Sequence, residues 1–270
     1  MTTRLAGVAG WPIAHSRSPL LHGTWIARYR LNAAYVPLAV APGDFTVAVR
    51  GLAAAGFRGI NVTIPHKEAA FALCDDVLPR ARRAGAVNTL VFAEGCITGD
   101  CTDGFGFLES LPGFDPRSGP AVLLGAGGAA RAIAATLLDA GCPRLTLVNR
   151  SMARAEALAR ALGGPVEVAA APPLEGAALL VNTTSLGMVG QPQLEINLAP
   201  LPAHALVADI VYVPLETPLL AAARALGLAA VDGLGMLLHQ ARPGFSQWFG
   251  VEPVVDDALR RIVAADIPPR

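Results

Sequence analysis

Residues 59–67 have the sequence Gly-Ile-Asn-Val-Thr-Ile-Pro-His-Lys, in which a predicted strand runs into a predicted helix. Ile60, Val62 and Ile64 alternate with polar residues, which is the period-two pattern of a strand with one buried face. Pro65 ends the strand because it has no N–H group to donate, and its fixed φ suits the first position of a helix. The stretch therefore predicts a strand-to-helix junction.

Lys67 falls in the first turn of this predicted helix, where the helix dipole disfavours a cation. A local rule that is broken at such a junction often marks a functional site. The dipole and partial burial would lower the pKa of the amine, as a lysine acid/base near neutral pH requires. A solvated surface lysine fits the spacing equally well, so the rest of the chain has to decide between the two interpretations.

The composition restricts what the chain can bind. Its 270 residues suffice for two domains of ordinary size or one large one, and 53% of them are hydrophobic. The formal net charge is zero, with 21 basic and 21 acidic side chains. Nucleic-acid and membrane-surface binders need a basic stripe that this composition does not supply. A small-molecule partner is therefore expected, with no nucleic acid and no membrane.

The cysteines indicate the compartment. Cys74, Cys96, Cys101 and Cys142 form no Cys-x-x-Cys pair, and no histidine lies at zinc-ligand spacing from them. We therefore expect unpaired thiols in a reducing compartment and no metal site. A secretory signal is disfavoured by Pro12 in the first apolar run, and no run has the uninterrupted length of a membrane span. The expected location is cytoplasmic.

The first hundred residues alternate predicted strands and helices, as in an α/β domain. Strands are expected over residues 5–9, 35–40, 60–64, 87–92 and 97–99, and helices over 43–55 and after Ser18 and Pro65. Ser18 followed by Pro19 is a typical N-cap with proline at the first helical position, so capping alone explains Ser18. Ser16 is not explained by capping, and in an extended loop it would point to the same side as Ser18.

A domain boundary is expected at residues 100–106, which are rich in turn formers and precede a stiff, proline-containing connection. The second domain opens with a predicted strand over 121–124, a glycine-rich turn and a helix. Gly125 and Gly127 occupy the first two places of a dinucleotide-binding fingerprint, and Ala130 occupies the third, where Ala is tolerated. The N–H groups of this turn would hold a pyrophosphate.

The next predicted strand, over residues 145–148, indicates which dinucleotide binds. An NAD site usually has a carboxylate near the end of this strand, where it binds the ribose hydroxyls. This sequence has no acid there and offers Asn149, Arg150, Ser151 and Arg154 instead. Two guanidinium groups and a hydroxyl suit a 2′-phosphate, so the predicted cofactor is NADP. The alternative is that these arginines only solvate the start of a helix.

Two further strands are predicted over residues 179–181 and 206–211. The first runs into the polar residues 182–185 and the second into Tyr212. Both transitions fall at the presumed carboxyl edge of the sheet, where such folds bind ligands.

Several motifs stand in a fixed order along nearly the whole chain. On one side they are Ser16-Arg17-Ser18-Pro19, Asn61-Val62-Thr63-Ile64-Pro65-His66-Lys67, Gly85-Ala86-Val87-Asn88-Thr89, Thr102-Asp103-Gly104 and Met236-Leu237-Leu238-His239-Gln240-Ala241. On the nucleotide side they are the Gly125 turn, Asn149-Arg150-Ser151, Asn182-Thr183-Thr184-Ser185-Leu186-Gly187-Met188 and Asp209-Ile210-Val211-Tyr212-Val213-Pro214. This set of motifs resembles the shikimate dehydrogenase family.

The resemblance implies the catalytic chemistry. Lys67 and Asp103 would contact the ring hydroxyl that is oxidised as hydride passes to NADP, and Lys67 would exchange the hydroxyl proton. The charge of Asp103 would raise the pKa of Lys67 and the helix end would lower it, and the sequence does not decide which prevails. The residues implied to bind the substrate are Ser16, Ser18, Asn61, Thr63, Lys67, Asn88, Asp103, Tyr212 and Gln240.

The resemblance also implies the cofactor site. The residues implied to bind NADP are Gly125, Ala126, Gly127, Gly128, Ala129, Asn149, Arg150, Ser151, Arg154, Thr183, Ser185, Ile210 and Gly233. The nicotinamide would lie in a cleft between two domains, beside Ile210 and Gly233, and closure of the cleft would exclude water. A monomer or a homodimer is expected.

The implied architecture is α/β with two domains. Residues 1–103 would form an N-terminal α/β domain that binds substrate and carries the catalytic pair, and residues 104–235 a doubly wound, Rossmann-type NADP-binding domain. Residues 236–270 would form C-terminal helices that return to the first domain, so that Gln240 reaches the substrate. The implied activity is that of an oxidoreductase, an NADP-dependent shikimate dehydrogenase that transfers hydride reversibly between NADPH and 3-dehydroshikimate in aromatic amino acid biosynthesis.

Two residues depart from the family pattern. Cys101 replaces the usual Asn before Thr-Asp-Gly, which would loosen the loop that holds Asp103, and Pro243 predicts a kink or break in the last helical region. The alternatives are an NAD-dependent quinate/shikimate dehydrogenase, a paralogue for an amino-substituted ring and a non-catalytic ligand sensor. Arg150 argues against NAD, and the presence of both Lys67 and Asp103 argues against the sensor.

Overall fold

The computed structural model describes residues 2–268 of the chain. The chain divides into two compact units, Met1–Asp103 with Leu237–Val263 and Gly104–Met236 with Ala264–Arg270. The grouping of Ala264–Arg270 with the second unit differs from the expectation that all of 236–270 packs on the first. Ile267 accounts for this grouping, because it is 7% exposed and lines a pocket with residues 214–218 of the second unit.

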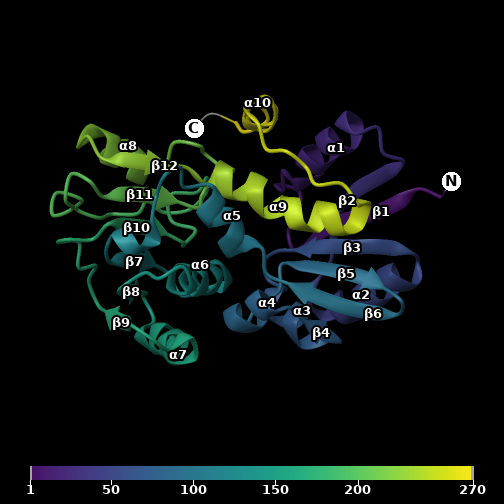
Figure 1. The fold of residues 1–270 in the computed structure, drawn as a ribbon, viewed down its shortest axis with the longest axis horizontal. Helices are drawn as coiled ribbons and strands as arrows, with labels where there is room; N and C mark the ends of the chain where they lie inside the picture. The colour runs from purple at the N-terminus through teal and green to yellow at the C-terminus, as the bar shows by residue number, and fades with distance from the viewer. Residues whose placement is uncertain (1, 269–270) are drawn as a thin grey trace. The chain divides into compact units, whose positions relative to one another are not determined.

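In the first unit, six strands form a mixed sheet in the order β2-β1-β3-β5-β6-β4 (Figure 1). β1 is parallel to β2 and β3, whereas β5 is antiparallel to β3 and β6. The strands are β1 (Arg4–Gly10), β2 (Ala33–Ala39), β3 (Phe57–Val62), β4 (Asp76–Val77), β5 (Thr89–Ala93) and β6 (Cys96–Asp100). Four helices lie within this unit: α1 (Ser18–Arg28), α2 (Phe45–Ala54), α3 (Lys67–Leu73) and α4 (Pro79–Ala84). Three helices cross the boundary between the two units: α5 (Asp103–Glu109), α9 (Gly233–Phe249) and α10 (Asp257–Ala265).

The strand at the centre of this sheet corrects the prediction of one buried face. β3 is buried from Gly59 to Val62, and the amide side chain of Asn61 is only 5% exposed. Since consecutive residues of a strand point to opposite faces, both faces of β3 are covered by the protein. The strand ends at Val62, and Ile64, which was expected to be buried, is 74% exposed.

The two helix starts near the predicted site also differ in detail from the prediction. α3 begins at Lys67, two residues after Pro65, so Pro65 belongs to the preceding turn and Lys67 to the first helical turn. α1 begins at Ser18 itself, and Ser18 makes no side-chain cap. Instead the Ser18 N–H donates to Ser16 Oγ at 3.3 Å, because an N–H at a helix start needs an acceptor outside the helix. Ser16, not Ser18, therefore performs the capping role.

Pro243 does not interrupt the last long helix. It lies inside α9, which continues to Phe249, so the predicted break is absent. Phe245, Trp248 and Phe249 are each at most 3% exposed, and this buried aromatic face stabilises the helix beyond the proline.

Gly59 is the point at which α9 approaches the sheet. The Trp248 Nε1–H donates to the Leu90 carbonyl at 3.0 Å, and a Cβ on Gly59 would lie 2.2 Å from Nε1. The φ of Gly59 is +156°, which favours glycine. A side chain at position 59 would therefore displace the C-terminal part of α9 from the first unit.

In the second unit, six parallel strands form a sheet in the order β12-β11-β10-β7-β8-β9 (Figure 1). The strands are β7 (Ala121–Leu124), β8 (Leu145–Val148), β9 (Val166–Ala169), β10 (Leu179–Asn182), β11 (Leu206–Asp209) and β12 (Ala229–Val231), and the main helices are α6 (Gly128–Asp139), α7 (Met152–Leu162) and α8 (Pro218–Ala225). Alternate residues of β7 enter two cores, with Leu123 packing beside α6 and α7 and Val122 beside α8. This two-sided packing confirms the predicted doubly wound, Rossmann-type fold.

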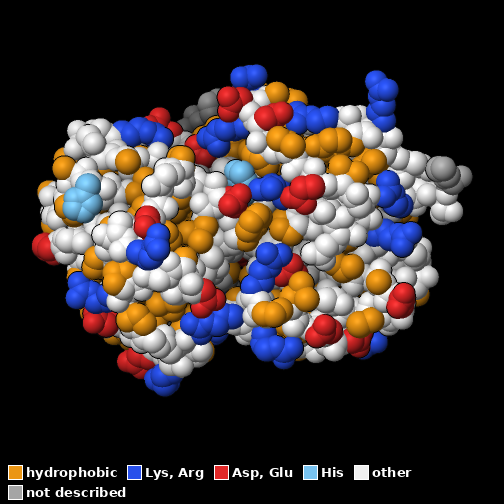
Figure 2. All heavy atoms as spheres, viewed as in Figure 1, with side chains coloured by type: hydrophobic (Ala, Val, Ile, Leu, Met, Phe, Trp, Pro, Cys, Tyr) orange, Lys and Arg blue, Asp and Glu red, His pale blue; other side chains and the backbone are white. Residues whose placement is uncertain are grey.

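On the face drawn in Figure 2, basic and acidic side chains are interspersed, as expected for a chain of zero net charge. Within residues 2–268, no helix combines the length and apolar character needed to cross a bilayer.

Candidate active site and nucleotide turn

Lys67 and Asp103 form an ion pair at the carboxyl edge of the first sheet. Lys67 is the first residue of α3 and Asp103 the first of α5, and the Lys67 ammonium donates a hydrogen bond to Asp103 Oδ2. The two side chains are 18% and 8% exposed. The pair is thus shielded from bulk water but still reachable by a small molecule.

The ion pair decides the direction in which the pKa of Lys67 moves. Burial alone would lower the pKa of the ammonium, but the charge of Asp103 and its hydrogen bond outweigh burial and raise the pKa above its ordinary value. The sequence left open which of the opposing effects on this pKa prevails, and the charge of Asp103 prevails. At neutral pH, Lys67 is an ammonium that can donate a proton.

Asn88 connects this pair to the rest of the site. Its Nδ2 donates to Asp103 Oδ1 at 2.8 Å, to Thr102 Oγ1 at 3.0 Å and to Gln240 Oε1 at 3.3 Å. Asn88 Oδ1 accepts the Thr102 N–H at 2.8 Å. The site therefore brings the residue before β5, the start of α5 and α9 into one buried hydrogen-bond network within the first unit.

Asn61 lies beneath this network. Its Oδ1 accepts from the Tyr35 hydroxyl at 2.7 Å, and its Nδ2 donates to Thr89 Oγ1 at 3.1 Å and to the Asn88 carbonyl at 3.3 Å. Both ends of the amide are thus engaged inside the protein.

The remaining residues predicted to bind substrate lie at the ends of other elements. Ser18 is the first residue of α1 and is 5% exposed, and Ser16 precedes the helix and accepts the Ser18 N–H. Thr63 follows β3, and its N–H donates to the Ala9 carbonyl at 2.9 Å. Tyr212 belongs to the second unit, after β11, and is partly exposed.

Two supporting contacts near the catalytic pair were not predicted. His66 Nε2 bonds to the Val40 carbonyl at 2.8 Å, and the ring stacks on Phe45 with centroids 4.5 Å apart, which anchors the turn before Lys67. Arg80 Nε donates to Asp100 Oδ1 at 2.6 Å, and that carboxylate is 1% exposed. His66 stands in a quoted motif without a predicted role, and Arg80 stands in none, so only the tertiary structure reveals these contacts.

The loop that carries Asp103 is well packed despite Cys101. The Cys101 side chain is 3% exposed, and its N–H donates to Asp100 Oδ1 at 2.8 Å. Burial and the nearby charge of Asp103 raise the pKa of the thiol to about 12, so it stays neutral at physiological pH. The predicted loosening of this loop is therefore not found.

In the second unit, the glycine turn between β7 and α6 leaves space for a ligand beside the start of α6. Gly125 has φ +116°, and a Cβ there would lie 2.5 Å from Thr183 Oγ1. Gly127 is the N-cap of α6, and a Cβ there would meet no protein atom within 4 Å among the described residues. The five predicted turn residues are Gly125, Ala126, Gly127, Gly128 and Ala129. Such a turn at the start of a helix fits a pyrophosphate.

The two arginines after β8 are available to an anion. Arg150 and Arg154 are exposed, and neither is in an ion pair within residues 2–268. Ser151 is the N-cap of α7, and Asn149 Nδ2 donates to the Ser151 carbonyl at 2.9 Å. These donors fit a phosphate on the adenosine ribose better than free ribose hydroxyls.

Thr183, Ser185, Ile210 and Gly233, also predicted to bind cofactor, lie near strand ends of the second sheet. Thr183 Oγ1 donates to the Leu124 carbonyl at 2.6 Å, next to Gly125. A Cβ on Gly233 would lie 2.2 Å from the Ile210 carbonyl oxygen, so these two residues are in close backbone contact. Ser185 is exposed in the loop after β10.

A buried carboxylate lies under the same edge and was missed from the sequence. Asp209 is 2% exposed and accepts from Thr217 Oγ1 at 2.8 Å, Asn182 Nδ2 at 3.0 Å and the Val211 N–H at 3.0 Å. Burial raises the pKa of Asp209 to about 6, although all three hydrogen bonds oppose the shift. Asp209 ties together the loops after β10 and β11.

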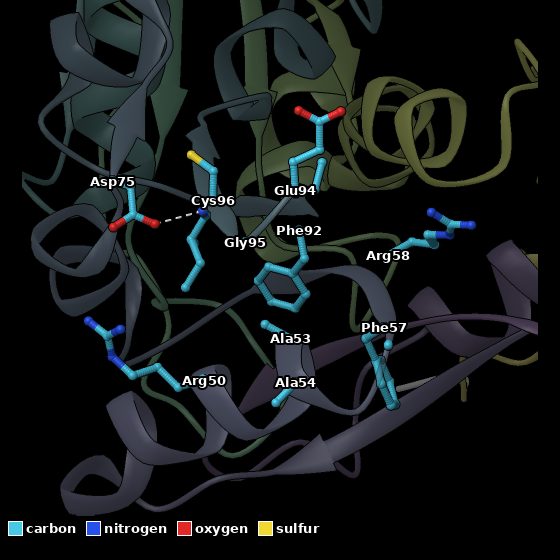
Figure 3. A pocket seen from close by; sticks show the side chains of 13 residues that line it. Arg50, Ala53, Ala54, Phe57, Arg58, Asp75, Phe92, Glu94, Gly95 and Cys96 are labelled. Atoms are coloured by element: carbon cyan, nitrogen blue, oxygen red, sulfur yellow. Dashed lines mark hydrogen bonds between the residues drawn. The ribbon is translucent and has the colours of Figure 1, made fainter.

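A surface pocket of the first unit lies away from these residues. It has a volume of about 460 Å³ and is lined by the start of β3 and the end of β5, including Phe57, Arg58 and Phe92 (Figure 3). Lys67 follows the opposite end of β3. Asp75, at the pocket wall, accepts the Ile97 N–H at 2.8 Å. The pocket is therefore separate from the predicted catalytic residues.

Comparison with known proteins agrees with the sequence motifs. A family model described as the shikimate dehydrogenase substrate binding domain matches residues 8–90, and one described as shikimate / quinate 5-dehydrogenase matches residues 114–181. The shikimate dehydrogenase (NADP(+)) of Rhodospirillum rubrum is 62% identical and covers 96% of each chain, and that of Acidiphilium cryptum is 64% identical and covers 98% of this chain and 97% of its own. The structure of Thermus thermophilus shikimate 5-dehydrogenase in complex with NADP(H) and shikimate is 37% identical, with a TM-score of 0.88 over 98% of this chain and 100% of that one. This chain belongs to the shikimate dehydrogenase family.

Proposed function

We propose that this chain is an NADP-dependent shikimate dehydrogenase, which transfers hydride reversibly between NADPH and 3-dehydroshikimate to give shikimate in aromatic amino acid biosynthesis. The observation that carries the proposal is the Lys67–Asp103 pair held by Asn88 at the edge of the first sheet. Relatives more than 60% identical over nearly the whole chain bear this activity in their names.

The catalytic step follows from the charge state of Lys67. In the reducing direction, the Lys67 ammonium donates a proton to the oxygen of the forming hydroxyl, and in the oxidising direction the neutral amine takes that proton back. Asp103 accepts from the ammonium and orients it. NADP, when bound, supplies or accepts the hydride at the ring carbon.

The proposed substrate contacts are short polar side chains, which suit a small polyhydroxy acid. They are Ser16, Ser18, Asn61, Thr63, Lys67, Asn88, Asp103, Tyr212 and Gln240. Asn88 and Gln240 support this assignment because they adjoin Asp103 in one network. Asn61 is the weakest member because its amide is engaged inside the protein.

The proposed NADP contacts are a backbone cradle and a pair of cations. The turn at Gly125–Ala129 would hold the pyrophosphate, and Arg150 and Arg154, with Asn149 and Ser151, would hold the 2′-phosphate. Thr183, Ser185, Ile210 and Gly233 would contact the nicotinamide half. The exposed, unpaired guanidinium groups support NADP over NAD.

We further propose a cytoplasmic enzyme that acts on small molecules as a monomer or homodimer. Cys74, Cys96, Cys101 and Cys142 are free thiols, which suits a reducing compartment.

A two-by-two turnover assay tests the function. Shikimate and quinate are each offered with NADP⁺ and NAD⁺, and nicotinamide absorbance is followed. We expect turnover mainly with shikimate and NADP⁺. Comparable rates with quinate or NAD⁺ would assign the chain to the dual-substrate branch. Ligand binding without turnover in all four combinations would support a sensor instead.

A further inference from the structure

Tyr35 is a buried residue outside the predicted site whose hydroxyl bonds to a residue of the site. It lies in β2, its side chain is 8% exposed, and its hydroxyl donates to Asn61 Oδ1 at 2.7 Å. The neutral His22 ring stacks on the phenol with centroids 3.9 Å apart and planes 3° apart. The phenol is therefore held in one position, with its hydroxyl aimed at Asn61.

A series of hydrogen bonds leads from Asn61 to Asp103, beside two bonds to the backbone, from Asn61 Nδ2 to the Asn88 carbonyl and from the Thr102 N–H to Asn88 Oδ1. Asn61 Nδ2 donates to Thr89 Oγ1 at 3.1 Å, and Thr89 Oγ1 donates to Asn88 Oδ1 at 3.0 Å. Asn88 Nδ2 then donates to Asp103 Oδ1 at 2.8 Å, while the other oxygen of Asp103 accepts from Lys67. The chain of donors thus begins at the Tyr35 hydroxyl and ends at the catalytic carboxylate.

A primary amide can be turned by half a rotation with almost no change in shape, so only its partners decide which end is the donor. Asn61 and Asn88 are 5% and 2% exposed, so bulk water does not make that choice. Burial raises the pKa of Tyr35 well above its ordinary value, with Ser18 opposing the shift, so the phenol keeps its proton and remains a donor.

We propose that Tyr35 is a positioning residue for the catalytic pair: its hydroxyl holds the Asn61 side chain in place, and Asn61 supports, through Thr89, the Asn88 side chain that donates to Asp103. In this chain Asn61 has a positioning role in addition to its proposed substrate contact. The proposal rests on the proposed function, in which Asp103 and Lys67 carry out proton exchange.

The central variant is Tyr35→Phe, which removes only the hydroxyl and keeps the stack on His22. We expect kcat with shikimate and NADP⁺ to fall about tenfold, because the buried Asn61 oxygen loses its donor and the chain that supports Asn88 loses its first member. The KM for NADP⁺ should stay unchanged, because the predicted cofactor residues lie in the second unit. The matched control is Tyr29→Phe, which also removes one hydrogen bond, from the Val254 N–H at 3.0 Å, but outside this chain.

Thr89 distinguishes positioning from a general loss of stability. Thr89→Val breaks the same chain with little change of shape. The double variant Tyr35→Phe/Thr89→Val should therefore lose no more kcat than Thr89→Val alone. If the two substitutions acted independently, their losses of kcat would multiply. Thr89→Ser should restore most of the rate because it keeps the hydroxyl. Multiplying losses, or a Tyr35→Phe enzyme with the kcat of Tyr29→Phe, would overturn the proposal.

A crystal structure of Tyr35→Phe separates this proposal from the proposed function. We expect the hydrogen bond between Asn88 Nδ2 and Asp103 Oδ1 to be lengthened or lost, and unchanged geometry throughout the chain would overturn the positioning role. If the wild-type protein fails to oxidise shikimate, the proposed function fails, and the crystal structure still decides whether Tyr35 orients Asn88.

Discussion

The polar side chains at the carboxyl edge of the first sheet bond to one another, whereas the arginines at the carboxyl edge of the second sheet make no ion pair within residues 2–268. Asn88 alone donates to Asp103, Thr102 and Gln240. Arg150 and Arg154, in contrast, are exposed beside a glycine turn with open space around Gly127. The difference suits the two tasks, because proton exchange needs side chains fixed in advance, whereas a phosphate is bound by charge and accessible N–H groups.

The largest effect is expected at Lys67, the residue proposed to exchange the proton. Lys67→Ala should lower kcat by about 10²–10⁴-fold, because the proton donor is lost, while the KM for shikimate changes little. Lys67→Arg is the matched variant, since it keeps a cation beside Asp103 but cannot release a proton near neutral pH. Steady-state kinetics with both variants check this, and substantial activity in Lys67→Arg would contradict proton exchange by residue 67.

A smaller effect, on stability, is expected at Asp209, which is buried although it lies at the same sheet edge as the exposed arginines. Because folding raises its pKa from 3.8 to about 6, the folded state favours the protonated form. The contribution of Asp209 to the free energy of unfolding is therefore fully present below pH ~4 and is lost as pH rises through about 6, a change of about 3 kcal/mol.

Denaturant unfolding of the wild type and Asp209→Asn between pH 4 and 7 measures this contribution. The stability difference between the two proteins should shift against the wild type as pH rises, since the amide does not titrate. Parallel pH dependences would show that Asp209 does not titrate in this range.

The smallest of the three effects is expected at the exposed arginines. Arg150→Ala should weaken NADP⁺ binding by about 10–30-fold, because a charged hydrogen bond is lost, and leave NAD⁺ binding within about twofold. Arg160→Ala is the control, because Arg160 lies in α7, 4.0 Å from Glu156 and away from the strand end. Isothermal titration calorimetry measures both affinities, and equal losses for the two dinucleotides would refute a 2′-phosphate contact.

The sequence predicted the features that depend on local pattern. The strand, glycine turn and helix at residues 121–139 follow from an apolar run and glycine spacing, and the Lys67 helix start follows from Pro65 and the helix formers after it. Burial of Asn61 was not predicted, because it depends on which parts of the chain pack against that face of β3. A period-two pattern describes one strand and contains no information about its neighbours.

The site residues also divide into those that a sequence motif indicates and those that only the tertiary structure reveals. The motifs singled out Lys67, Asp103, Asn88 and Gln240, which the structure brings into one network. Tyr35 and Thr217 were missed because each acts through a hydrogen bond that only the tertiary structure shows. A tyrosine in a strand and a threonine at a helix start already have ordinary explanations from the sequence. The roles of the residues in substrate and cofactor binding stay predictions until the variants are measured.

The ion pair with Asp103 involves the one lysine in the sequence, since the other basic residues among the 21 are all arginines. Isotope labelling of lysine side chains would therefore give a single ammonium signal in a nuclear magnetic resonance spectrum, and that signal would belong to Lys67. Its titration would report the protonation state of this amine directly, with substrate or cofactor added or withheld and without any substitution. The protein thus carries a built-in spectroscopic probe at the atom proposed to exchange the proton.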